Sequence, residues 1–148
     1  MNTLNIGSKT NDWRARELSN FASGEFIAFG IRLASVEGFW VGLKFDEGSP
    51  EQLKAFTLSG YEAKKFGYKA PKRGSFTFQG RTYKVGSSEH QNLMRLALRA
   101  KFTQVEKAQR ALLATKGLVL THIMPRDSIT IPGAVFSRML MDIREEVG

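Results

Sequence analysis

The segment ASVEGFWVGLKF (34–45) predicts a helix that carries two charges inside an apolar run. Ser35 stands where its side chain can accept a hydrogen bond from a free backbone amide of the first turn, so we expect the helix to run from Ser35 to about Phe45. Glu37 and Lys44 lie seven residues apart within it. Seven helical residues turn through about 700° and rise about 10 Å, so both side chains leave the same face. They can lean towards a common point, which could hold one atom of a ligand.

The flanking segments mix helix and strand signals. EFIAFGIRLAS (25–35) predicts a hairpin or bent strand around Gly30, SFTFQGRTYKV (75–85) a hairpin about Gly80, and LVLTHI (118–123) a strand. Cap residues and apolar spacing predict further helices from about 49 to Gly60, at 61–67, 88–101, 104–115 and 133–146. We therefore expect an α+β fold: one compact, mostly helical domain over residues 1–148 with a few short strands. The polar residues 1–12 are expected to be a loosely held lead-in.

Composition limits the classes of function. The chain has 148 residues, with 22 Lys and Arg against 14 Asp and Glu, a net charge of +8 and no cysteine. This excess of positive charge favours a polyanionic partner or substrate. The missing cysteines exclude disulfides, thiolate catalysis and cysteine-ligated zinc, and they agree with a reducing compartment. We see neither a signal peptide nor an 18-residue apolar run, so the sequence predicts a cytoplasmic protein that does not span a membrane.

A lysine and a carboxylate that share a dry site can cleave a glycosidic bond. A lysine that is shielded from water has a lowered pKa, so its neutral amine can act as a nucleophile towards an anomeric carbon. The carboxylate can transfer protons or stabilise an oxocarbenium-like charge. Phe39 and Trp40 offer flat surfaces on which a nucleobase could stack. The same residues also fit an ordinary amphipathic helix, with Glu37 and Lys44 complementing the helix dipole and the aromatic rings in the core.

Five blocks in a fixed order resemble a known family. ELSNF (17–21), Phe26, Gly30 and the S-x-E and Lys-Phe positions of the 34–45 segment give the order LSNF, F, G, SxE, KF, which resembles the signature of the NADAR family of YbiA-like N-glycosidases, associated with NAD and ADP-ribose. The likeness continues through the rest of the chain, in AKKFG (63–67), ALRAKFTQ (97–104), LLATKG (112–117) and LMDIREE (140–146).

The resemblance implies a compact α+β fold and hydrolysis of an N-glycosidic bond to ribose. We expect no cofactor and no metal. By position, Glu37 and Lys44 match the acidic and lysine residues of the family's active site, and Lys44 is a candidate for an imine at the ribose C1. Asp127 matches loosely an aspartate ahead of a glycine-rich segment, of which Gly133 remains. The motifs and the two aromatic rings together give the substrate-binding candidates Ser19, Asn20, Phe21, Phe39, Trp40, Asp127 and Gly133.

The chain also departs from this family pattern. Gly38 and Val41 stand where the family usually has His and Gln, and SITIPGAVFS (128–137) replaces its glycine-rich segment. Members similar to this chain act on ADP-ribose joined to guanine in DNA or on early riboflavin-pathway intermediates. We expect the first, an ADP-ribosyl group on a nucleic-acid base, because a basic surface suits a polyanion. A phosphoribosylamino-pyrimidine intermediate remains an alternative, as does a module that binds ADP-ribose or nucleic acid without turnover.

Two further segments bear on binding. KKFGYKAPKR (64–73) could follow phosphates and stack a base, or could simply be a solvated loop; its candidate nucleic-acid contacts are Lys64, Lys65, Tyr68, Lys69, Lys72 and Arg73. GSSEHQ (86–91) imitates the SxE motif, but Glu89 and Lys101 are twelve positions apart, so on one helix they diverge by about 120°. We therefore interpret Ser88 to Gln91 as a capping box. His122 is expected to be a satisfied core residue.

Overall fold

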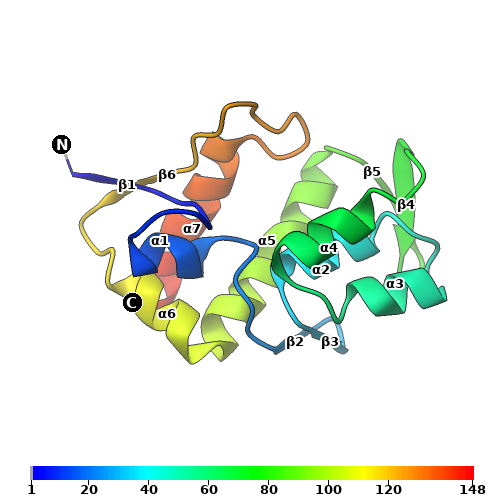
Figure 1. Ribbon diagram of the computed structural model, residues 1–148, viewed down its shortest axis with the longest axis horizontal. Helices are drawn as coiled ribbons and strands as arrows, with labels where there is room; N and C mark the ends of the chain where they lie inside the picture. Colours follow the sequence, from blue (N-terminus) through cyan, green and yellow to red (C-terminus); the bar gives the residue numbers. More distant parts are fainter. Residues whose placement is uncertain (1) are drawn as a thin grey trace.

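The computed structural model describes residues 2–148, which form seven helices and six short strands (Figure 1). The expected α+β, mostly helical fold is confirmed. In chain order the elements are β1 (Thr3–Asn5), α1 (Trp13–Leu18), β2 (Phe26–Ala28), β3 (Ile31–Leu33), α2 (Val36–Gly42), α3 (Pro50–Ala55), α4 (Gly60–Gly67), β4 (Ser75–Phe78), β5 (Arg81–Lys84), α5 (Ser88–Gln104), α6 (Glu106–Leu113), β6 (Val119–Thr121) and α7 (Gly133–Val147).

Helix α5 is the centre of the fold. Its buried residues recur at spacings of three and four, which places them in one broad stripe along the helix. It packs against α2, β2 and β5 and also against α6 and α7. Figure 1 shows α5 crossing the molecule between α7 and the group formed by α2, α3 and α4. Elements from both halves of the chain therefore pack against this one helix.

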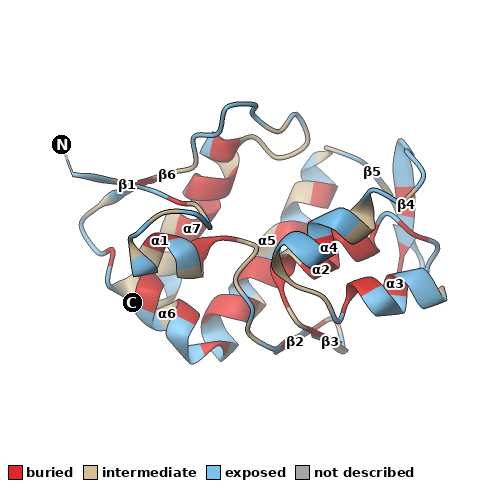
Figure 2. Cartoon of the chain, in the orientation of Figure 1, coloured by how far each residue is buried: buried red, intermediate tan, exposed pale blue. Residues whose placement is uncertain are grey.

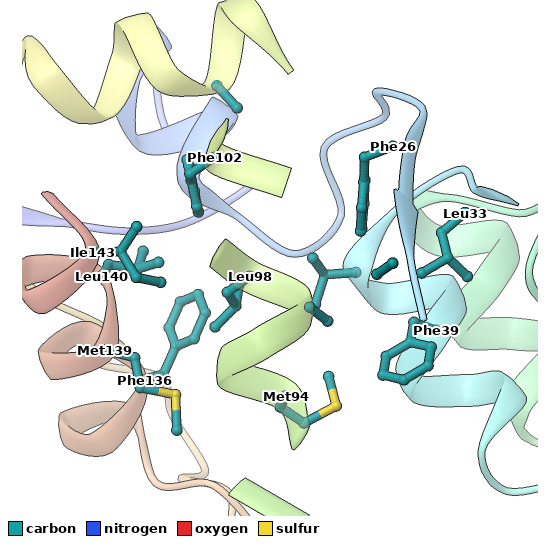
Figure 3. Close-up of a cluster of buried hydrophobic side chains, with 14 of the residues drawn as sticks. Phe26, Leu33, Phe39, Met94, Leu98, Phe102, Phe136, Met139, Leu140 and Ile143 are labelled. Atoms are coloured by element: carbon teal, nitrogen blue, oxygen red, sulfur yellow. The ribbon is translucent and has the colours of Figure 1, made fainter. Parts of the chain in front are cut away.

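The hydrophobic core surrounds α5. Figure 2 shows the buried residues along α5 and α7, with exposed residues outermost. Figure 3 shows side chains from α7, α5 and the β2–α2 region meeting in this cluster. The four residues of α7 that the spacing predicts to face inward are all buried, namely Phe136, Met139, Leu140 and Ile143. The helical period of the last helix is thus confirmed.

Both predicted hairpins are present. Phe26 pairs with Leu33 across β2 and β3, and β4 and β5 pair in the same antiparallel manner. Each turn has two residues with positive φ, at Phe29 and Gly30 and at Gln79 and Gly80. Two consecutive left-handed residues give the two-residue turn whose twist matches that of the strands, and the glycine in second place adopts it without strain.

The expectation of a loose lead-in is wrong for residues 3–6. β1 pairs in parallel with β6, with Thr3 opposite Val119 and Asn5 opposite Thr121. Ile6 follows the strand and is only 1% exposed. The backbone hydrogen bonds to β6 and the burial of the Ile6 side chain together hold this polar segment in place. Met1 lies outside the described residues.

Several helix boundaries differ from the prediction, and α3, expected to reach Gly60, already ends at Ala55. Helix α2 ends at Gly42 because the amides of Lys44 and Phe45 bond to carbonyls three residues back, which tightens the chain into turns. Helix α5 is capped by Ser87, whose Oγ accepts from the amide of His90 at 3.2 Å. The capping box expected from Ser88 is therefore wrong by one residue.

Candidate functional site

Glu37 stands in the first turn of α2, where two neighbours hold the backbone. The Oγ of Ser35 accepts from the amide of Gly38 at 2.9 Å, which caps the helix. The amide of Glu37 donates to the carbonyl oxygen of Asn20 at 3.1 Å. This bond places the SNF turn against the start of α2, so the two motif segments meet.

The carboxyl group of Glu37 lies in an unusual electrostatic setting. Burial raises its pKa above the ordinary glutamate value, while the charges of Lys44 and, more weakly, Lys64 oppose that rise. Lys44 follows α2 and Lys64 lies on α4, so two elements direct positive charge at one half-buried acid. A raised pKa keeps the proton on the carboxyl to higher pH, as a general acid requires.

Lys44 does not lie in the dry environment that the sequence suggested. Its side chain is exposed, and its Nζ lies 6.0 Å from the centre of the Trp40 ring. Because α2 ends at Gly42, the angular relation of an ideal seven-residue helical spacing does not extend to Lys44. The amine nevertheless remains close enough to act on the carboxyl of Glu37.

The SNF turn presents an unpartnered oxygen beside Glu37. Ser19 is buried, and its Oγ accepts from the amide of Phe21 at 3.2 Å. The Oδ1 of Asn20 is buried and has no hydrogen-bond partner within the described residues. A buried polar atom without a partner costs roughly 1–3 kcal/mol, so Asn20 is suited to accept a hydrogen bond from a bound molecule.

The two aromatic candidates, Phe39 and Trp40, differ in how far they are buried. Phe39 is fully buried and packs against Phe29 at 5.3 Å and Phe78 at 5.5 Å between ring centres. It has no face free for a base, so its assignment to substrate binding is wrong. Trp40 is half-buried and stacks on the imidazole of His90 at 5.1 Å. Adjacent helical residues point about 100° apart, so only one of the two rings enters the core.

Asp127 and Gly133 come together, but at another place. One carboxylate oxygen of Asp127 accepts from the amides of Ser128 at 2.9 Å and Gly133 at 2.8 Å, ahead of α7. Helix α7 packs against α5, α6 and β6, and Figure 1 places α5 between it and α2. A hollow beside Asp127 is also lined by His122, whose Nδ1 lies 3.0 Å from the carbonyl oxygen of Ile6. The structure does not bring Asp127 and Gly133 to Glu37.

Two hollows in the described surface lie away from Glu37 and Lys44. One is the hollow beside Asp127. The other lies where β5 meets α5 and is lined by Arg81, Tyr83 and Glu89, among others. Neither hollow includes Glu37 or Lys44.

The departures at positions 38 and 41 have a structural cause. A Cβ on Gly38 would lie 2.5 Å from the carbonyl oxygen of Leu58 and 2.6 Å from that of Ala55. Val41 is buried and would contact a Cβ placed on Gly67 of α4. This face of α2 packs directly on its neighbours, which leaves no space there for the larger polar side chains that the resemblance led us to expect.

The basic segment 64–73 is exposed and only partly paired within the chain. Arg73 forms an ion pair with Asp46 at 2.8 Å. The amines of Lys65 and Lys69 lie over the rings of Tyr61 and Phe66. The remaining candidates in the segment, Lys64, Tyr68 and Lys72, are exposed as well.

Sequence reasoning missed the most deeply buried charged group near the site, Lys101. It is 2% exposed on α5, and its Nζ donates to the carbonyl oxygen of Ser19 at 3.0 Å. Burial lowers its pKa to about 7. Lys101 lies four residues after Ala97 and three after Leu98, at apolar-face spacing, and this was the signal that could have revealed it.

His90 should make the protein sensitive to mild acid. Burial lowers its pKa to about 4, and its Nδ1 accepts from the amide of Gly86 at 3.1 Å. Between pH 6.5 and 4 the unfolded chain binds a proton that the folded chain does not, so stability falls as pH falls through this window. The expected loss is about 3 kcal/mol. Urea unfolding from pH 7 to pH 4 measures it, and His90→Phe should remove that part of the slope; an unchanged slope would contradict the assignment.

Among the described residues, no helix combines the length and the apolar character needed to cross a bilayer.

Comparisons with known proteins agree with this architecture. The NMR structure of the E. coli protein YbiA superposes with a TM-score of 0.69 at 24% identity, over 99% of this chain and 84% of that one. The expected resemblance is thereby confirmed as a shared fold. The chain is also 30% identical over 154 residues to an uncharacterized 17.1 kDa protein of the Gp30-rIII intergenic region of enterobacteria phage T4, which covers 99% of this chain and 100% of that protein. Residues 12–145 match the model of the family described as bacteriophage protein GP30.3. The chain therefore belongs to the bacteriophage GP30.3 family and has the fold of YbiA.

Proposed function

We propose that the protein is an N-glycosidase that releases ADP-ribose from guanine in nucleic acid, with Glu37 as the acid and Lys44 as the nucleophile. One observation carries the proposal: the half-buried carboxyl of Glu37 has a raised pKa although Lys44 and Lys64 both act on it. The unpartnered Oδ1 of Asn20, on the turn that bonds to the Glu37 amide, supports the same location.

The reaction balances in two steps. The amine of Lys44, after losing a proton to solvent, attacks the ribose C1, a C1–N bond to the lysine forms, and the C1–N bond to the base breaks as Glu37 gives its proton to the base. The lysine nitrogen then carries a positive charge beside the Glu37 carboxylate, which moves one of its protons to the ring oxygen as the C1–O bond of the ring breaks, so that a protonated imine joins C1 to the lysine. Water next attacks C1, Glu37 takes a proton from it, and the lysine leaves as a neutral amine that regains its proton from solvent. Free ADP-ribose is the product, and both side chains return to their starting forms.

The preference for a nucleic-acid substrate rests on charge. The net charge of +8 and the exposed basic segment 64–73 suit a phosphate backbone. Lys64 belongs to that segment and also acts on Glu37, so the basic surface adjoins the proposed site. Such binding should weaken as salt rises. We place the activity in the cytoplasm, as the cysteine-free sequence suggests.

The test uses DNA that carries ADP-ribose on guanine. Glu37→Gln should reduce kcat at least a hundredfold, the lower range for loss of general acid catalysis. Its control is Glu51→Gln, an exposed glutamate at the equivalent first turn of α3, which should retain full activity. Borohydride should trap the ribosyl group on the wild type but not on Lys44→Ala, whereas Lys54→Ala, an exposed lysine of α3, should still be trapped. Full activity of Glu37→Gln would overturn the proposal.

Two other outcomes select the alternatives. Turnover of a phosphoribosylamino-pyrimidine alone, lost in the Glu37 and Lys44 variants, would assign the same residues to a small substrate. Binding of ADP-ribose without turnover or trapping would indicate a binding module. The exposure of Lys44 and the close packing at Gly38 are the observations that favour the module as the second candidate.

A further inference from the structure

Lys101 is buried in a place where a lysine is costly. Its Nζ makes one hydrogen bond, to the carbonyl oxygen of Ser19, although an ammonium carries three donors. The charges that act on it come from two other elements: Glu17 of α1 favours its charged form and Lys107 of α6 opposes it. Glu17 is itself incompletely satisfied, since its Oε2 is buried without a hydrogen bond to any of residues 2–148 and lies 3.9 Å from the Nζ of Lys107. Removing only one member of a pair of buried charges leaves the other uncompensated, so Lys101 and Glu17 have to be considered together.

The single bond of Lys101 reaches the turn that contacts Glu37. Ser19 gives its carbonyl to Lys101 on α5, and the next residue, Asn20, gives its carbonyl to the amide of Glu37 on α2. Two consecutive peptide units of the SNF turn are thus bonded to two different helices. The same turn holds the unpartnered Oδ1 of Asn20. The position of that oxygen relative to Glu37 therefore depends on the hydrogen bond between Lys101 of α5 and Ser19.

We propose that Lys101 is a positioning residue: through the carbonyl of Ser19 it holds the SNF turn against the start of α2 and so fixes Asn20 and Glu37 relative to each other. This inference rests on the proposed function, because it assigns Lys101 to the same site. Lys101 does not touch the substrate. Its bond sets where Asn20 can accept a hydrogen bond and how firmly the first turn of α2 is held.

The test compares Lys101→Met, which keeps the length and removes the donors, with Lys107→Met, which changes charge beside Glu17 without touching Ser19. Amide hydrogen exchange gives a readout that needs no activity. In Lys101→Met the amide of Glu37 should exchange at least tenfold faster, while the amide of Leu140 on α7 keeps its rate. Lys107→Met should leave both rates unchanged. Unchanged exchange at Glu37 in a folded Lys101→Met protein would overturn the proposal.

Two additions keep the outcome decisive. Lys101→Arg, which retains N–H donors, should restore slow exchange at the amide of Glu37. If Lys101→Met does not fold, Lys101→Gln replaces it. Its shorter side chain still ends in an N–H donor, so the amide of Glu37 should exchange faster than in the wild type, but by a smaller factor. On ADP-ribosylated DNA, Lys101→Met should lower kcat at least tenfold and change KM less than threefold. A wild type without turnover would remove the proposed function, whereas the exchange result would still decide whether Lys101 holds the turn.

Discussion

Gly38→Ala should destabilise the protein by about 4 kcal/mol, at the upper end of single-residue effects. A Cβ at this position would lie 2.5 Å from the carbonyl oxygen of Leu58 and 2.6 Å from that of Ala55. These are backbone atoms, so no rotamer change can make room, and α2 would have to move off the 55–58 segment. At an open helical position the same change would instead stabilise by up to about 1 kcal/mol. The expected sign is therefore opposite to that of intrinsic helix propensity.

Thermal unfolding measures this effect. A loss of this size should lower the melting temperature by on the order of 10 °C in a chain of this length. Gly74→Ala is the control, since a Cβ there would meet nothing within 4 Å. A Gly38→Ala melting temperature equal to that of Gly74→Ala would show that α2 and the 55–58 segment can separate freely. It would also reopen position 38 to the histidine that the NADAR-like pattern has there.

Alkaline pH should stabilise the wild type relative to Lys101→Met. Burial lowers the pKa of Lys101 to about 7 from an ordinary value of 10.5. Between these values the unfolded chain holds a proton that the folded chain has released, so the free energy of unfolding rises with pH. Below pH 7 both states are protonated and the penalty for burying the charge is complete. Over the whole window the gain amounts to roughly 5 kcal/mol.

Urea unfolding at pH 7, 8.5 and 10 tests this prediction. The difference in unfolding free energy between wild type and Lys101→Met cancels the other titrating groups and isolates Lys101. We expect the stability of the wild type relative to Lys101→Met to increase from pH 7 to pH 10. A difference that stays constant over this range would show that Lys101 keeps its ordinary pKa in the fold.

Local signals were sufficient for the elements whose causes are local. The hairpin turns at Gly30 and Gly80 need positive φ, which glycine supplies, and the spacing from Phe136 to Ile143 marks the buried face of α7. Sequence reasoning did not identify α1 or β1. Helix α1 has six residues and packs on α6, and β1 has three residues and pairs with β6. Elements this short are stabilised by packing against distant segments, which a local sequence pattern does not predict.

The arrangement of the candidate site was partly predictable for a similar reason. The order of the motifs indicated Glu37 and the SNF turn, and the structure joins them through the carbonyl of Asn20. The exposure of Lys44 was not predictable, because it follows from α2 ending at Gly42 through three-residue hydrogen bonds. Asp127 was matched by motif order alone, which does not reveal that α5 separates it from α2. Lys101 was discarded as part of a false motif, although its helical phase pointed inward.

The pairing of β1 with β6 also affects how the chain can be made. Asn5 and Thr121 face each other across this parallel ladder although 116 positions separate them. A ribosome therefore delivers the first strand long before its partner exists, and the N-terminal segment must stay unpaired until most of the polypeptide has emerged. Closing such a long loop is entropically expensive, so this ladder should be a late event in folding. Truncated products that stop before residue 119 would carry an unsatisfied strand and an uncovered Ile6 side chain, which makes them natural substrates for chaperones and proteases.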